Sequence, residues 1–234
     1  MSDHVLNRPV WSAFGGRQAD VAIRRGGALR THPDFGLFAG SADNSPSALA
    51  DLGALVADHG DVGLVELFDP PSVPGTRVVS RAVCLQMTAD TVAAAWTADF
   101  EILDLGDPDA AEMLALATLT KPGPFFSRTH QLGSFVGVRV DGRLAAMAGE
   151  RMRPEGYTEA SGVCVHPDYR GRGYAARLLR EVTARILARG EKAFLHSYAD
   201  NVTAIGLYES LGYRGRREVV FTILTAGGSP NAEP

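Results

Sequence analysis

The sequence contains few cysteines. Cys84 and Cys164 are the only two in a chain of 234 residues, and each stands in an apolar run far from the other. A disulfide framework needs more cysteines, and a zinc site needs ligands at closer spacing. We therefore interpret both as small core residues and expect no bound metal.

The sequence also lacks long apolar runs. No stretch reaches the length of about 18 apolar residues that a transmembrane helix needs. The N-terminal residues, MSDHVLNRPVWSAFGG, do not show the basic segment followed by an apolar segment that is typical of a secretory signal. These absences predict a cytoplasmic protein with no membrane partner.

Positive charge is not in excess. The formal net charge is -4 at pH 7, so electrostatics gives no reason to expect nucleic acid as a partner. With 45% hydrophobic and 21% charged residues, the composition is that of an ordinary globular protein. The length allows one large domain or two small ones.

Residues 1–96 predict a small α/β domain. Hydrophobic patterns predict a strand at residues 35–40, a helix at 47–60, strands at 62–68 and 77–87, and a short helix at 88–96. The first 30 or so residues show no clear period. No phosphate loop, histidine cluster or carboxylate pair stands out here, so we expect a structural or substrate-shaping role.

Residues 97–226 predict a second, larger domain. We expect a strand at residues 100–106, a helix at 107–119, and a hairpin that turns at Asp141 and Gly142. A strand at 157–166, a long helix ending near Gly190 and a strand at 193–199 form a right-handed parallel crossover. A short helix at 201–212 and one long strand or a strand pair follow. Residues 227–234 read as a disordered tail.

The letters RGRGYA, residues 170–175, stand between the third strand and the long helix. Backbone amides at a helix N-terminus favour an anion, and glycines allow a close approach of phosphate. The spacing does not suit a dinucleotide fold, because five residues separate the strand from Gly171 and antiparallel strands precede it. No Gly-Lys-Ser/Thr follows, which excludes a P-loop.

These residues resemble the GCN5-related N-acetyltransferase (GNAT) superfamily. Its acetyl-CoA loop, Gln/Arg-x-x-Gly-x-Gly/Ala, is matched by Arg170, Gly173 and Ala175. A second family pattern, Asn-x-x-Ala-x-x-Leu-Tyr-x-x-x-Gly-Tyr/Phe, is matched at residues 201–213. The resemblance covers about residues 99–225. It implies a mixed antiparallel and parallel sheet flanked by helices. The smaller α/β domain that precedes it is interpreted as a degenerate copy of the same fold, because its order of strand, helix and strand echoes that of the second domain.

The resemblance also implies a cofactor site. Acetyl-CoA would be the cosubstrate, with its pantetheine arm along one strand and its pyrophosphate on the glycine loop. The residues implied are Val163, Cys164, Val165, Arg170, Gly171, Arg172, Gly173, Tyr174, Ala175, Asn201 and Tyr208. The arginines of the long helix are interpreted as its solvated face.

Acetyl transfer needs an amine without its proton, so a base must be available. Glu159 is the candidate base, because it lies at the offset that the histone acetyltransferase branch uses; Glu150 and a chain of water molecules are the alternatives. Tyr208 is the candidate general acid. His196 and Tyr198 face the same side of their strand and either line the acceptor pocket or pack in the core.

The sequence thus predicts an N-acetyltransferase that moves acetyl from acetyl-CoA to a primary amine in a ternary complex. Two other hypotheses stay open: an acyl-CoA-binding sensor or scaffold without catalysis, and a transferase of longer acyl groups. The acceptor amine and the oligomeric state, including a homodimer, are not determined. The first domain is expected to bind no cofactor and to wall the acceptor site.

Overall fold

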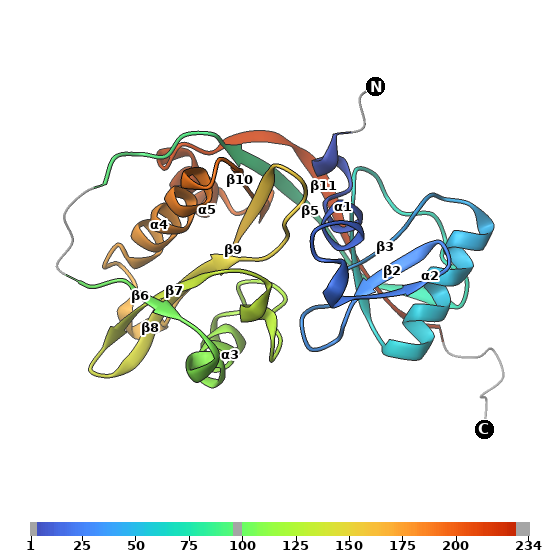
Figure 1. Ribbon diagram of the computed structural model, residues 1–234, viewed down its shortest axis with the longest axis horizontal. Helices are drawn as coiled ribbons and strands as arrows, with labels where there is room; N and C mark the ends of the chain where they lie inside the picture. Colours follow the sequence, from blue (N-terminus) through green and yellow to red (C-terminus); the bar gives the residue numbers. More distant parts are fainter. Residues whose placement is uncertain (1–3, 96–99, 228–234) are drawn as a thin grey trace.

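The computed structural model describes residues 4–95 and 100–227. Its elements fall into two lobes, with α1, α2, β2 and β3 on the right of Figure 1 and α3, α4 and β6–β9 on the left. The helices are α1 (Pro9–Gly15), α2 (Pro46–His59), α3 (Ala110–Thr120), α4 (Tyr174–Ala188) and α5 (Val202–Ser210). Five 3-10 turns lie at Val5–Asn7, Ala19–Val21, Asp107–Asp109, Thr129–Leu132 and Pro167–Tyr169.

The strands form two sheets. They are β1 (Ala22–Arg25), β2 (Ala28–Thr31), β3 (Ala39–Ser41), β4 (Val62–Glu66), β5 (Thr76–Ala89), β6 (Leu103–Leu105), β7 (Phe135–Val140), β8 (Arg143–Glu150), β9 (Tyr157–Val165), β10 (Lys192–Tyr198) and β11 (Arg214–Ala226). The smaller sheet has the order β1-β2-β3, and the larger has the order β4-β11-β5-β10-β9-β8-β7-β6.

The larger sheet is mixed, as the sequence predicts. Its one parallel ladder among the described strands joins β9 to β10, and the other neighbours are antiparallel. β5, from the first predicted domain, is inserted between β10 and β11 from the second. Figure 1 shows the two long strands β5 and β11 running between the lobes. The boundary at residue 96 stays a prediction about domains, although strands from both sides of it share one sheet.

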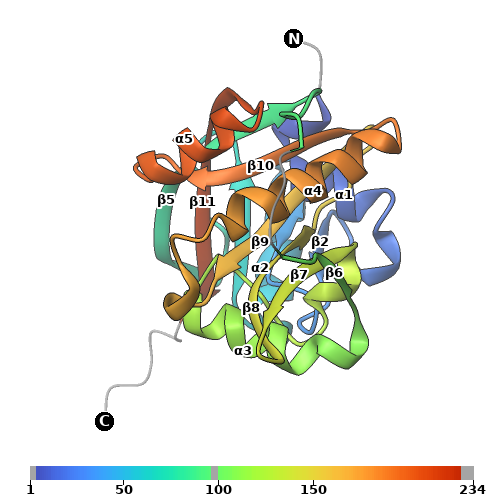
Figure 2. The same cartoon turned by 90° about the vertical axis from the view of Figure 1, so that its left-hand side faces the viewer.

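Helices cover both faces of this sheet. The apolar face of α4, with Leu178, Leu179, Val182 and Ile186 buried, packs across β7–β10, as Figure 2 shows from the side. α3 packs on β8 and β9 in a separate cluster that contains Met113, Met147 and Cys164. Burial of these side chains is the main force that holds each helix in place.

Several predicted elements are confirmed. The β7–β8 turn has positive φ at both Asp141 (50°) and Gly142 (78°), as a type I′ hairpin requires. α4 ends before Gly190, whose φ of 78° is that of a helix-terminating glycine. The last strand is one long strand, β11.

The helix predicted at residues 88–96 is wrong over the part that the structure describes. β5 continues through Ala89, because Thr88 and Ala89 pair with Phe194 and Ala193 of β10, and residues 90–95 are not helical. Strand pairing thus overrides a local alanine-rich preference. Of the predicted tail, only Gly227 is described; it donates a hydrogen bond to the carbonyl of Gly75. We find no helix able to span a bilayer within residues 4–95 and 100–227.

Candidate functional site

The glycine loop forms the N-terminus of α4. Gly171 has φ of 75° and Gly173, the N-cap residue, has φ of 78°, a left-handed conformation that favours glycine. The amides of Gly171, Arg172 and Gly173 donate no hydrogen bond to another described residue. The first-turn amides of the helix lack intrahelical partners by geometry. The loop therefore presents several free N–H groups, together with the positive end of the helix dipole.

A cavity of about 430 Å³ lies against this loop. It is lined by Val163, Cys164, Val165, Arg170, Gly171, Arg172, Gly173, Tyr174 and Ala175, together with Thr120, Pro122, Tyr169, Ala176 and Leu207. The strand and loop residues that the sequence assigns to the cofactor thus gather around one cavity. Asn201 and Tyr208 line a neighbouring cavity instead.

The neighbouring cavity opens where β9 and β10 separate. These strands pair only between Tyr157–Glu159 and Lys192–Phe194. Beyond that point β9 still pairs with β8, but its other edge has no partner strand within the described chain. A register shift against β8 coincides with Gly162, whose φ is 64°. Such a bulge frees backbone groups and re-aims them.

This inner cavity has a volume of about 140 Å³ and shares Pro122 and Val163 with the loop cavity. The two cavities therefore adjoin at Pro122 and Val163, between the glycine loop and the gap between β9 and β10. Side chains from residues 1–96 line the inner cavity too, namely Phe38, Val65 and Cys84.

Tyr208 and Asn201 lie on α5 at the inner cavity. Burial raises the pKa of the Tyr208 phenol, so this group is protonated at neutral pH. Asn201 is the N-cap of α5, and its side chain accepts a hydrogen bond from the amide of Ala204 at 3.2 Å. Its amide nitrogen remains available to the cavity.

Glu159 lies in the inner cavity with its carboxylate fully engaged. Arg151 donates two hydrogen bonds to it, from Nε to Oε2 and from Nη2 to Oε1, each 2.8 Å long. His196 Nδ1 lies 2.8 Å from Oε1. Burial alone would raise the pKa of this carboxyl, but Arg151 and His196 hold it at about 2. This geometry argues against the predicted role of Glu159 as general base.

A glutamine fixes the far side of His196. Gln86 Nε2 lies 3.0 Å from His196 Nε2 and donates a second bond of 3.0 Å to the carbonyl of Leu6. The Gln86 carbonyl oxygen accepts from Arg216 Nη1 at 2.7 Å. Because an amide nitrogen can only donate, His196 Nε2 must be the acceptor, which places the imidazole proton on Nδ1 toward Glu159.

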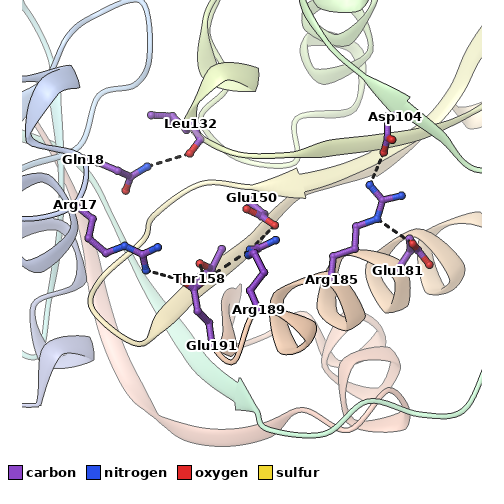
Figure 3. A network of polar contacts seen from close by, with 10 residues as sticks. All are labelled: Arg17, Gln18, Asp104, Leu132, Glu150, Thr158, Glu181, Arg185, Arg189 and Glu191. Atoms are coloured by element: carbon purple, nitrogen blue, oxygen red, sulfur yellow. Dashed lines mark hydrogen bonds and ion pairs between the residues drawn. The ribbon is translucent and has the colours of Figure 1, made fainter.

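Glu150, the alternative base, lies on the opposite face of the sheet. Its side chain accepts a 2.8 Å hydrogen bond from Arg189 of α4, as Figure 3 shows. It lines neither the loop cavity nor the inner cavity. In the same view, Arg185 bonds Asp104 and Glu181. These helix arginines contact protein carboxylates rather than the loop cavity.

Neither cysteine has the character of a nucleophile. Burial raises the pKa of both thiols to about 11. Both are therefore neutral at physiological pH, and only a thiolate attacks efficiently.

Sequence reasoning missed Arg151, Gln86 and the aromatic side chains of Phe38 and Phe221. One signal was available for Arg151: it stands across the β8–β9 connection from Glu159, eight positions earlier, at a distance that a hairpin closes. Gln86 carried no signal, because the insertion of β5 beside β10 is a long-range pairing.

Comparison with known proteins gives consistent matches. The family described as FR47-like protein matches residues 135–222. The N-alpha-acetyltransferase RimI of Mycobacterium tuberculosis is 34% identical over 133 residues, which cover 50% of this chain and 82% of that protein. An acetyltransferase of Yersinia pestis is 46% identical over 50 residues, but these span only 36% of its length.

Solved structures agree. A crystal structure from Novosphingobium aromaticivorans, assigned to the GNAT family of acetyltransferases, superposes with a TM-score of 0.89 at 49% identity. It covers 96% of this chain, and this chain covers all of it. A GCN5-related N-acetyltransferase from Kribbella flavida has the same fold, with a TM-score of 0.62 at 19% identity over 94% of this chain and 97% of that one.

Proposed function

Because this chain belongs to the GCN5-related N-acetyltransferase superfamily, we propose that it transfers acetyl from acetyl-CoA to a primary amine by direct attack in a ternary complex. The observation that carries the proposal is the pair of adjoining cavities, one at the glycine loop and one at Tyr208 in the gap between β9 and β10. A cosubstrate with a charged diphosphate at one end and a thioester at the other fits such a pair of cavities.

The glycine loop suits the diphosphate. Free amides at Gly171–Gly173 and the N-terminus of α4 offer hydrogen bonds and positive potential to phosphate oxygens. A Cβ at Gly171 or Gly173 would meet open space, so the glycines serve the backbone conformation rather than relieving a clash with the protein. Arg170 and Arg172 line the same cavity and add positive charge.

The unpaired edge of β9 suits the pantetheine arm, whose amides can pair with a strand edge as an added strand would. Val163, Cys164 and Val165 would supply the backbone groups, and Asn201 a side-chain donor. Ser161, Gly162 and Val163 at the bulge line the inner cavity, and their backbone amides would face the thioester oxygen. Fixed donors at that position stabilise the charge that develops during attack.

The reaction needs few protein groups. The neutral amine nitrogen forms a bond to the thioester carbon, the carbon–sulfur bond breaks, and the nitrogen releases a proton to solvent water, which is the source from which the phenol is later reprotonated. The sulfur leaves as a thiolate. Tyr208, which is protonated at neutral pH, would donate its proton to that thiolate and regain one from water. The neutral, buried cysteines support direct transfer over an acetylated enzyme.

The test is a turnover assay with acetyl-CoA and a set of primary amines, in which mass spectrometry detects the acetylated amine and a thiol reagent detects released coenzyme A. We expect stoichiometric formation of both. Tight binding of acetyl-CoA with no product from any amine would instead favour the sensor or scaffold alternative. Faster transfer from longer acyl-CoA thioesters would favour the transferase of longer acyl groups.

A further inference from the structure

We propose that the acceptor is an amine that is already largely unprotonated near neutral pH, of which the α-amino group of an amino acid or peptide is the common example. The reason is that the inner cavity offers no free base: each basic side chain that lines it is already bonded to the protein. This inference rests on the proposed acetyl transfer and names the class of amine that the site can use.

The carboxylate of Glu159 is not free to accept a proton from the amine, because both of its oxygens are already hydrogen-bonded. Its two oxygens receive three hydrogen bonds of 2.8 Å from Arg151 and His196, and the amide of Met152 lies 3.4 Å from Oε2. The side chain is 1% exposed. Protonation of this group would break a buried ion pair, which is strongly unfavourable.

The imidazole of His196 is occupied at both nitrogens. Nδ1 donates to Glu159, and Nε2 accepts from Gln86. A proton on Nε2 would face the amide hydrogens of Gln86. Rotating that amide would in turn break its bonds to Arg216 and to the carbonyl of Leu6. Gln86 is therefore a positioning residue that keeps both nitrogens of His196 engaged in hydrogen bonds.

The other titratable groups around the cavity are not bases at neutral pH. Cys84 of β5 is a neutral thiol and Tyr208 of α5 a neutral phenol. Tyr198 of β10 lines the cavity as a second phenol. Asp200, after β10, is exposed and does not line the cavity, and Arg216 of β11 lies behind Gln86. No side chain in residues 4–95 and 100–227 is thus placed in the cavity as a free base.

The consequence is selectivity by the amine's own acidity. An α-amino group has a pKa of about 7.7–8.0 and a lysine-like amine one of about 10.4, so their neutral fractions at pH 7 differ by roughly 300-fold. If the cavity cannot remove a proton, the apparent specificity should follow this fraction.

The experiment measures kcat/KM with saturating acetyl-CoA for amines of similar size: an α-amino amide, an unsubstituted alkylamine, and an alkylamine whose basicity is lowered by fluorine. At pH 7 we expect the α-amino amide and the fluorinated amine to exceed the alkylamine by at least about 100-fold in kcat/KM, following their neutral fractions. Each profile against pH should rise until the pKa of that amine, without a shared plateau near neutrality.

A second readout does not depend on turnover. Nitrogen NMR of the imidazole, assigned with a His196→Asn variant, should show the His196 proton on Nδ1 and Nε2 as a hydrogen-bond acceptor. A Gln86→Glu variant should shift His196 toward the charged form, because a carboxylate would accept a proton from Nε2.

The proposal is overturned if the alkylamine is acetylated as well as the α-amino amide at pH 7, with profiles that all level off at one enzyme ionisation. It is also overturned if His196 titrates with a free Nε2 in the wild-type protein. Absence of transfer to any of the three amines would contradict the proposed function itself, which keeps the two failures distinct.

Discussion

Two strand–helix–strand units of this protein can be compared directly. In the C-terminal half, β9 and β10 pair as parallel strands only at their beginnings, with α4 between them in sequence. In the N-terminal half, α2 connects β3 to β4, which meet in a single parallel bridge between Phe38 and Gly63. The two units have similar connections, but different groups lie at the start of the helix and where the two strands separate.

The helix starts differ in hydrogen bonding. α4 begins after Gly173, which has no side chain to cap it, and its free amides face a cavity. α2 begins after Ser45, whose hydroxyl accepts from the amide of Ala48, and Pro46 removes a donor. Asp43 accepts from the Ser45 amide and brings a negative charge there. The N-terminus of α4 thus has free amides that can bind an anion, whereas the N-terminus of α2 is capped by protein groups.

The gaps between the strands differ in the polar groups that line them, although a cavity of about 440 Å³ lies at the N-terminal one as well. Arg8 enters the gap of the N-terminal unit and donates to the carbonyls of Ser41 and Ala42, with Glu66 of β4 at 3.4 Å from Nε. The corresponding gap of the C-terminal unit is the inner cavity. The first half thus differs from the second by a helix cap and an arginine at the corresponding place, and the absence of a cofactor there stays a prediction.

The largest expected effect comes from the glycine loop. A Gly173→Asp variant should weaken acetyl-CoA binding by between about 100-fold and about 1,000-fold, because it adds left-handed strain and a charge that repels phosphate. Calorimetric titration measures it. Gly142→Asp is the matched control, since Gly142 has the same φ of 78° in the β7–β8 turn. Equal loss in both variants would contradict a phosphate role for the loop.

The next effect concerns the proposed proton donor. Tyr208→Phe should lower kcat by about 100-fold while acetyl-CoA affinity changes little, because only proton donation to the leaving thiolate is lost. Tyr198→Phe is the control, since Tyr198 lines the same cavity but is 50% exposed on β10. Steady-state rates at saturating acetyl-CoA distinguish them. An unchanged kcat for Tyr208→Phe would remove the assigned role.

The C-terminal unit could be predicted from the sequence because its signals are local. The glycine loop, the apolar face of α4 and the Asp141–Gly142 turn each occupy a short segment, and the structure confirms the helix and the turn. The N-terminal unit and the floor of the cavity could not. The insertion of β5 beside β10, the reach of Arg8 to Ala42 and the bond from Gln86 to His196 join residues far apart in the chain.

The contacts of Glu159 show the same limit. Its position in a strand before the loop was readable, but its proton affinity depends on Arg151 of the β8–β9 connection and His196 of β10. A pKa is set by three-dimensional neighbours and burial, so a sequence offset alone cannot assign a base.

A smaller effect is expected from the arginine in the N-terminal gap. Arg8→Ala should lower the free energy of unfolding by about 1–3 kcal/mol, because carbonyl oxygens and the partly buried Glu66 lose their donor. Urea denaturation measures it. Arg81→Ala, which removes an exposed pair with Asp69, should have a clearly smaller effect. The cofactor titration should still give one equivalent per chain. Binding of a second equivalent by the Arg8→Ala variant would mean that Arg8 alone prevents cofactor binding in the N-terminal unit.

The smallest effect separates a partly buried carboxylate, Glu66, from a fully buried one, Glu159, by the sign of their pH dependence. Burial raises the pKa of Glu66 above its ordinary value of 4.5, with Arg8 opposing, whereas Arg151 and His196 outweigh burial and hold the pKa of Glu159 at about 2. A raised pKa means that Glu66 favours folding most below 4.5 and that this contribution is lost as pH rises through its folded pKa. Relative to wild type, Glu66→Gln should therefore gain stability as pH rises from 4 toward 7.

Glu159 has the opposite sign, because its contribution to folding is present above pH 4.5 and is lost as pH falls toward 2. Denaturation across that pH range measures how the free energy of unfolding changes with pH. A Glu66→Gln curve parallel to that of the wild type throughout would mean that the Glu66 carboxyl is as well solvated as one at the surface.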